Sequence, residues 1–261
     1  MAIRELSAVL RENAALSRAE APIYEQNHFE IFHPWEQRRL IRDLSRYAGR
    51  RSLDVAAGTG NVVTKLRGGL RVALDLSPEM LAVLRRADPG VHAVVGLAEA
   101  LPFRDGAFDL TVMYSAVHHL ADLAPFAEMA RVTRPGGVVL LDHEEAFQEA
   151  GPKRVPYAVA RRMLRAIAGT WYWRRPAAAA HGAYRRTYWP HSGGLTVDFV
   201  LTDGGHPDPD TVERELRRHG LRVTRRHYLL EPLPMVSVWQ RLADGACRRW
   251  RLGHFAIEAT R

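Results

Sequence analysis

The sequence predicts an α/β fold in which helices cover both faces of a mostly parallel sheet. Residues 52–75 read as an apolar strand, a glycine-rich turn, a helix that begins near Asn61 and a second apolar strand. This order is that of a βαβ unit, whose parallel strands are buried on both faces. Strand and helix patterns then alternate as far as residue 143, which is typical of a doubly wound sheet.

The turn of this unit suits a ligand that carries a ribose. Gly58 and Gly60 follow the first strand, and residues without a Cβ let the backbone turn sharply and approach a ligand closely. The next helix would direct its free N–H groups and positive dipole end at the same place. Asp54 lies on the first strand, where it can face an ammonium group. Asp75 ends the second strand, where a carboxylate can accept hydrogen bonds from ribose hydroxyls. An NAD fingerprint needs a third glycine, and Val63 stands in its place.

Three later stretches follow this unit at regular intervals. They are ALDLSPEML at 73–81, GLAEALPFRDGAFDLTVMYSAVHHL at 96–120 and RPGGVVLLDHE at 134–144. With the first unit they resemble the class I S-adenosylmethionine-dependent methyltransferases, and most closely the branch with quinone-biosynthetic and natural-product enzymes. The first motif of that family reads D-x-G-x-G-x-G. Ala56 replaces its first glycine, a mild departure because the side chain stays small.

The resemblance implies a Rossmann-like sheet of seven strands whose last strand is antiparallel to its neighbours. Helix and strand patterns near the end of the chain suit this order. A helix with Asp210 as N-cap and Gly220 at its end leads into a strand from Leu221 to about Tyr228. A helix at 235–250 and a last strand at 253–261 complete the prediction.

The resemblance also implies S-adenosylmethionine as the cofactor. Many relatives carry an acid for the adenine amino group where this chain has Leu97, so we expect the backbone around Ala98 and apolar packing to hold the adenine. The predicted cofactor-binding residues are Asp54, Ala56, Gly58, Gly60, Asp75, Leu76, Ala98, Glu99 and Ser115.

The predicted organisation has four parts. Residues 1–48 form an N-terminal helical cap, 49–151 the cofactor-binding core, 152–207 a substrate lid and 208–261 the C-terminal part of the core sheet. The lid is predicted because its composition changes to aromatic residues and arginines without strand alternation.

Residues that could handle a proton follow the fourth and fifth strands, because reacting groups gather beyond the carboxyl ends of parallel strands. The predicted catalytic residues are His118, His143, Glu144 and, from the cap, His28. For His118, a structural or cofactor-shaping role is favoured over a catalytic one. The acids around His143 could bind a metal, but ordinary loop charges or a hydrogen-bonding base are favoured, so no metal is predicted.

Aromatic residues and arginines in the cap and the lid suit a flat or anionic substrate, through stacking and bidentate pairing. The predicted substrate-binding residues are Tyr24, Trp171, Tyr184, Arg185 and Tyr188. Each part also has a structural interpretation that stays open. The aromatic residues of the cap could pack into the core, and the predicted lid could be a small helical subdomain whose arginines face solvent.

The composition indicates which cellular location and which binding partners to expect. The 261 residues are 47% hydrophobic and 25% charged, as in globular proteins. There is no apolar run long enough to span a membrane, and acids in the N-terminal stretch argue against a targeting peptide, so a cytoplasmic protein is predicted. The single cysteine, Cys247, excludes an internal disulfide. The net charge of +8 is almost entirely arginine and comes without a nucleic-acid-binding module, so a nucleic-acid partner is not expected.

These observations predict a methyltransferase that moves a methyl group by direct displacement from S-adenosylmethionine to a small molecule, with specialised metabolism favoured. Two alternatives remain: a nicotinamide-dependent oxidoreductase on a Rossmann fold, and a noncatalytic or repurposed S-adenosylmethionine-binding protein. The residues leave open whether oxygen, nitrogen or carbon accepts the methyl group and whether a protein base is used.

Overall fold

The computed structural model describes residues 11, 14–15, 17–32, 34–120, 122–145, 209–229 and 254–261. The side chains of residues 26, 27, 29, 30, 35, 145 and 227–229 are outside this description. The predicted lid at 152–207, with Trp171, Tyr184, Arg185 and Tyr188, lies outside the described residues, as does the predicted helix at 235–250.

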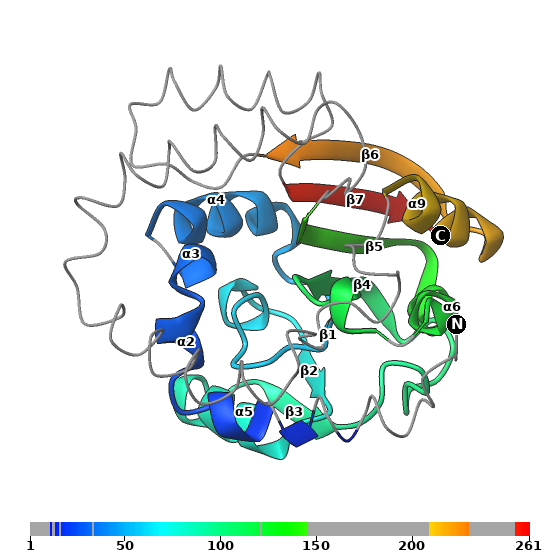
Figure 1. Ribbon diagram of the computed structural model, residues 1–261. Helices are drawn as coiled ribbons and strands as arrows, with labels where there is room; N and C mark the ends of the chain where they lie inside the picture. Colours follow the sequence, from blue (N-terminus) through cyan, green and yellow to red (C-terminus); the bar gives the residue numbers. More distant parts are fainter. Residues whose placement is uncertain are drawn as a thin grey trace, which may run out of the picture.

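Seven strands of the described chain form one sheet in the order β3-β2-β1-β4-β5-β7-β6 (Figure 1). Their bounds are β1 Ser52–Val55, β2 Arg71–Asp75, β3 His92–Val95, β4 Phe108–Tyr114, β5 Thr133–Glu145, β6 Arg222–Leu229 and β7 His254–Thr260. Strands β1 to β5 pair in parallel, whereas β7 is antiparallel to both β5 and β6. This confirms the predicted Rossmann-like doubly wound sheet with an antiparallel last strand.

Helices lie on both faces of the sheet. Their bounds are α2 Tyr24–Asn27, α3 Phe29–Phe32, α4 Pro34–Leu44, η1 Ser45–Tyr47, η2 Val63–Lys65, α5 Pro78–Ala87, η3 Val117–His119, α6 Ala124–Val132 and α9 Pro209–Arg218. One buried cluster joins α4 and η1, with Val62 and Leu66 on either side of η2, to β4 and β5. A larger cluster joins α6 and α9 to the opposite face of β1, β4, β5 and β7. Strand β5 is therefore packed on both faces, as a central strand of such a sheet must be.

The helix predicted near Asn61 is much shorter than expected. Residues 59–62 form turns, and only the 3-10 turn η2, Val63–Lys65, follows them. The chain extends again at Leu66, with ψ of 130°, and then passes through Gly68 and Gly69, both at positive φ. Two adjacent glycines in that conformation do not continue a helix, so a single turn is all that fits before β2.

Two other helix ends test the predicted caps. Ser77 caps α5 as predicted, because its hydroxyl accepts the backbone N–H of Met80 at 3.2 Å, and Pro78 opens the helix. The prediction that Asp210 caps the next helix is wrong. Helix α9 begins at Pro209, a residue suited to a first helical position, so Asp210 lies within the first turn. Gly220, at φ of 78°, follows the helix as predicted.

Candidate functional site

Backbone strain is concentrated where three adjacent strands end. Within the described chain, the non-glycine residues with positive φ are Ala56 at 56°, Ser115 at 50° and His143 at 61°. They lie at the carboxyl ends of β1, β4 and β5. A left-handed conformation costs a residue with a Cβ roughly 1–2 kcal/mol, and strain of this kind clusters at functional sites. This edge is also where open α/β sheets bind their ligands.

The glycine-rich loop after β1 depends on its glycines for two reasons. Gly58 and Gly60 have φ of 55° and 90°. A Cβ on Gly60 would also lie 2.3 Å from Cδ1 of Leu84 in α5, so a larger residue would force the buried Leu84 side chain to shift. Ala56 is a larger departure than its small size suggested, because at φ of 56° it adopts a conformation that glycine reaches without steric cost.

Two buried carboxylates brace this loop. Asp54 is 1% exposed and accepts the backbone N–H of Val63 at 3.0 Å. Burial raises the pKa of Asp54 to about 7. Asp75 accepts N–H groups on both oxygens, from Gly58 at 2.7 Å and from Ser77 at 2.8 Å. Burial raises the pKa of Asp75 as well. Leu76, half-buried, follows Asp75 at the end of β2.

Polar atoms beside the loop have no hydrogen-bond partner in the described part of the chain. They are the Thr59 hydroxyl and the side-chain Nδ2 of Asn61, both buried. Buried polar groups in native proteins are almost always paired with protein, water or ligand. These two atoms therefore fit a polar ligand that lies on the loop.

The N-terminal helices reach this loop. A Cβ built on Gly58 would meet Cε1 of Tyr24 at 4.0 Å, so α2 lies over the glycines. The Tyr24 ring contacts His28, with centroids 4.4 Å apart, and the Nε2 of His28 lies 3.4 Å from Glu20. On the predicted adenine side, Leu97 pairs with Ala100 in a single β-bridge. Ala98 packs against the main core there, and burial raises the pKa of Glu99.

His118 and Glu144 form a hydrogen-bonded pair between β5 and the turn η3. Glu144 is 0% exposed and accepts the N–H groups of Ala116 at 2.6 Å and Val117 at 2.8 Å. Its other oxygen lies 3.0 Å from Nδ1 of His118. Burial alone would raise the pKa of Glu144, but the bonds from His118 and the two amides lower it. An ionised Glu144 only accepts, so Nδ1 of His118 carries the proton of this bond.

His143 has different partners from His118. Its ring stacks between Tyr114 and His254, with centroids at 5.1 and 4.1 Å, and its Nδ1 lies 3.5 Å from Glu36. Burial lowers the pKa of His143, but Glu36 and Asp142 outweigh it, so the pKa is raised. The structure thus brings His118 and Glu144 together and places His143 and His28 in separate contacts. Their catalytic roles stay predictions.

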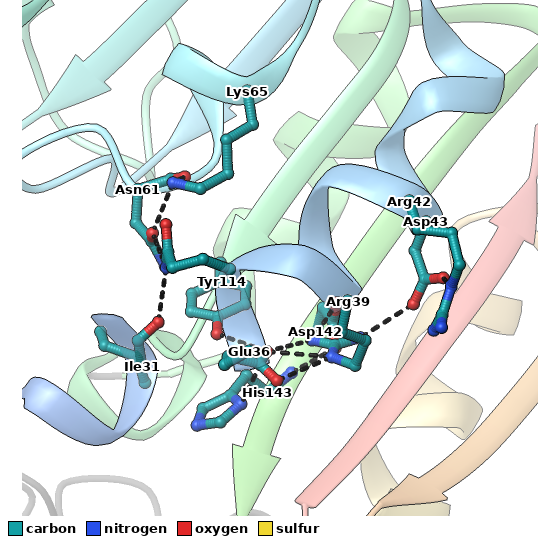
Figure 2. Close-up of polar contacts among 11 residues, drawn as sticks. Ile31, Glu36, Arg39, Arg42, Asp43, Asn61, Lys65, Tyr114, Asp142 and His143 are labelled. Atoms are coloured by element: carbon teal, nitrogen blue, oxygen red, sulfur yellow. Dashed lines mark hydrogen bonds and ion pairs between the residues drawn. The ribbon is translucent and has the colours of Figure 1, made fainter. Parts of the chain in front are cut away.

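Sequence reasoning missed a buried charged cluster that joins α4 to the sheet (Figure 2). Glu36 and Arg39 of α4 meet Asp142 of β5, with Arg39 Nη2 at 3.1 Å from Asp142. Glu36 and Arg39 are three residues apart, which on its own indicates an ordinary ion pair on a solvated helix face. No signal in the sequence showed that this face is buried. The described residues contain no group of three or more metal-binding side chains, and none of their helices is long and apolar enough to cross a membrane.

Comparison with known proteins agrees with this geometry. A family model described as a methyltransferase domain matches residues 53–141. A demethylmenaquinone methyltransferase of Renibacterium salmoninarum is 37% identical over 163 residues, which are 60% of this chain and 68% of that protein. An uncharacterized methyltransferase of Mycobacterium tuberculosis is 46% identical over 92 residues, 34% of this chain. The chain spans 38% of the length of that relative.

Solved structures share the fold. A chain from the complex between the Haloferax volcanii Trm112 methyltransferase activator and a methyltransferase has a TM-score of 0.59 at 18% identity. The match covers 94% of this chain and 96% of that chain. The chain therefore belongs to the class I S-adenosylmethionine-dependent methyltransferases, a family that takes its methyl group from S-adenosylmethionine.

Proposed function

We propose that the protein transfers a methyl group from S-adenosylmethionine to a small-molecule acceptor. The observation that carries this proposal is the glycine loop at the carboxyl edge of the sheet, held in left-handed conformations and braced by Asp75. A relative that this chain covers to 68% is named for demethylmenaquinone, which supports a small acceptor. A cytoplasmic location and the absence of a nucleic-acid partner remain predictions from composition.

The residues around the loop fit the cofactor. In this proposal Asp75 accepts the ribose hydroxyls, and Gly58 and Gly60 let the backbone come close to the ligand. The buried Thr59 hydroxyl and Asn61 amide would take up polar atoms of the amino-acid part. Bound there, the cofactor supplies a methyl group on a positively charged sulfur.

The side chains of His118 in η3 and Glu144 near the end of β5 would handle the acceptor. Glu144 holds the proton on Nδ1 of His118, so Nε2 is the basic nitrogen of that ring. In this proposal Nε2 takes the proton of an oxygen or nitrogen acceptor as the methyl group moves. Tyr24 of α2, which lies over Gly58, helps to exclude water and to align the acceptor.

Calorimetry on the full chain tests the cofactor. We expect S-adenosylmethionine and S-adenosylhomocysteine to bind and NAD not to bind. Asp75→Ala removes a charged acceptor and should weaken S-adenosylmethionine binding by roughly ten- to a hundred-fold. Asp105→Ala is the control, because the Asp105 side chain is 73% exposed and contacts Arg131. Thermal melts of both variants separate lost affinity from lost folding.

The results divide the alternatives. Binding of NAD in place of S-adenosylmethionine would overturn the proposal, and unchanged affinity in folded Asp75→Ala would remove the role of Asp75. Transfer of labelled methyl groups to a panel of quinols, phenols and amines then tests catalysis. A protein that binds S-adenosylmethionine and methylates no member of the panel would favour the noncatalytic alternative.

A further inference from the structure

Strand β5 bulges where it reaches the site. Leu141 of β5 pairs with Ile257 of β7, and the next pair is Glu144 with Phe255. Between these pairs β5 advances by three residues and β7 by two. The extra residue breaks the alternation of side chains and bends the strand. His143, inside the bulge, has φ of 61°. Such a conformation persists only where its surroundings enforce it.

Helix α4 supplies those surroundings. Asp142 and His143 are consecutive, and in a regular strand their side chains would point to opposite faces. Here both contact α4: Asp142 lies 3.1 Å from Arg39, and His143 lies 3.5 Å from Glu36. Glu144 turns to the other face and meets His118. The bulge therefore decides which of these side chains faces the predicted acceptor site.

Glu36 is the point where these contacts converge (Figure 2). It is 3% exposed and accepts from the Tyr114 hydroxyl at 3.0 Å and from Nε of Arg39 at 2.9 Å. Burial raises the pKa of Glu36, but its bonds to His143 and Arg39 outweigh this and lower it. Burial and the nearby acids raise the pKa of Tyr114, so Tyr114 keeps the proton it donates.

We propose that Glu36 is a positioning residue for the His118–Glu144 pair, acting through the β5 bulge. Glu36 and Arg39 hold Asp142 and His143 against α4, and the next residue, Glu144, is thereby directed at His118. This proposal rests on the proposed function, because it assigns the pair a role in methyl transfer. Without the charge of Glu36, the buried His143 ring loses the carboxylate that lies 3.5 Å from its Nδ1, and a buried polar group without its partner is costly, so we expect the strained bulge to relax.

The test uses the full chain and Glu36→Gln, which keeps the shape of the side chain and removes its charge. The Nδ1 proton of His118 is followed by long-range proton–nitrogen NMR spectra of labelled protein. In the wild type we expect a hydrogen-bonded Nδ1 proton. In Glu36→Gln we expect it to exchange with solvent about ten-fold faster or more, as it should in Glu144→Gln, because a bond to a charged partner is lost or weakened.

Asp43→Asn is the matched control. Asp43 lies on the same helix and also contacts Arg39, at 3.2 Å, but in the described chain it makes no contact with the bulge. We expect its His118 signal to match the wild type. If Glu36→Gln does not fold, Tyr114→Phe removes only the hydroxyl that Glu36 accepts and should move the His118 signal in the same direction by less.

Two outcomes decide the proposal. A His118 signal that moves in Glu36→Gln and Glu144→Gln but not in Asp43→Asn supports it. A signal that moves in Glu144→Gln alone overturns it and leaves Glu36 a merely structural ion-pair partner. Calorimetric binding of S-adenosylmethionine is measured on the same samples. If the wild type does not bind S-adenosylmethionine, the proposed function is contradicted. The His118 signal would still show whether Glu36 positions the His118–Glu144 pair.

Discussion

At the scale of single residues, the two acids of the first βαβ unit have different surroundings although they look alike in the sequence. Asp75 braces Gly58 at the edge of the sheet, where the pattern placed it. Asp54 is buried, and its oxygen accepts the N–H of Val63, so within the described residues it holds the η2 turn. An apolar strand that contains an acid predicts where a carboxylate lies, but it does not predict which backbone N–H groups donate to that carboxylate.

Asp54 should make stability depend on pH. Its pKa in the folded protein, about 7, lies above the ordinary 3.8. Its contribution to stability is therefore fully present below about pH 3.8 and is lost as the pH rises through about 7. Asp54→Asn removes this dependence. Between pH 5 and pH 8 we expect the wild type to lose roughly 2–3 kcal/mol more in free energy of unfolding than the variant does.

Urea unfolding at several pH values, followed by circular dichroism, measures this difference. The comparison of wild type and variant isolates Asp54 from the other buried acids, and Asp105→Asn serves as an exposed control. Parallel stability curves for wild type and Asp54→Asn across this range would show that Asp54 is not the buried titrating group.

The residues of the site were predictable in unequal measure. The glycine loop and Asp75 follow from local chemistry, because a turn that needs positive φ leaves glycine in the sequence. Glu36 and Arg39 do not, since their role depends on a helix face packing on β5, far along the chain. The sequence predicted that His118 and Glu144 lie at the same edge of the sheet, but it did not predict the hydrogen bond between them.

At the scale of elements, strands were predicted better than irregular structure. Apolar runs predict the strands because both faces of the sheet are covered. The bulge in β5 depends on its register with β7, which the sequence of β5 alone does not encode. Likewise η2 replaced a predicted helix because glycines on both sides of a short connection left room for one turn.

The N-cap of α5 is a local device whose energy can be measured directly. Ser77→Ala removes the hydroxyl that accepts the N–H of Met80 and should lower the free energy of unfolding by about 1 kcal/mol. Ser45→Ala is the control, because the Ser45 hydroxyl is exposed and bonds only the carbonyl of Arg42 among described groups. A Ser77→Ala loss no larger than that of Ser45→Ala in urea unfolding would contradict the capping role.

At the scale of the whole molecule, the carboxyl ends and the amino ends of the central strands differ in their polar contacts. The carboxyl ends of β1, β4 and β5 hold the strained backbone, and the loop after β1 holds the two buried polar atoms that have no hydrogen-bond partner within the described residues. The amino ends of the same three strands hold a satisfied ion cluster. There Asp109 accepts from Arg51 at 2.9, 3.0 and 3.2 Å and from Arg134 at 2.5 Å.

This separation predicts that stability can be lost at the amino ends without loss of ligand binding. The bonds from Arg51 and Arg134 lower the pKa of Asp109, against the effect of burial. Its stabilisation is thus present above about pH 3.8 and is lost as the pH falls below that value.

At pH 7, Asp109→Asn should lower the free energy of unfolding by about 1–2 kcal/mol. Its affinity for S-adenosylmethionine should stay within about two-fold of the wild type, because distant sites act independently. Urea unfolding and calorimetry on the same protein check both halves, and weakened binding in folded Asp109→Asn would show that the two ends of the sheet are coupled.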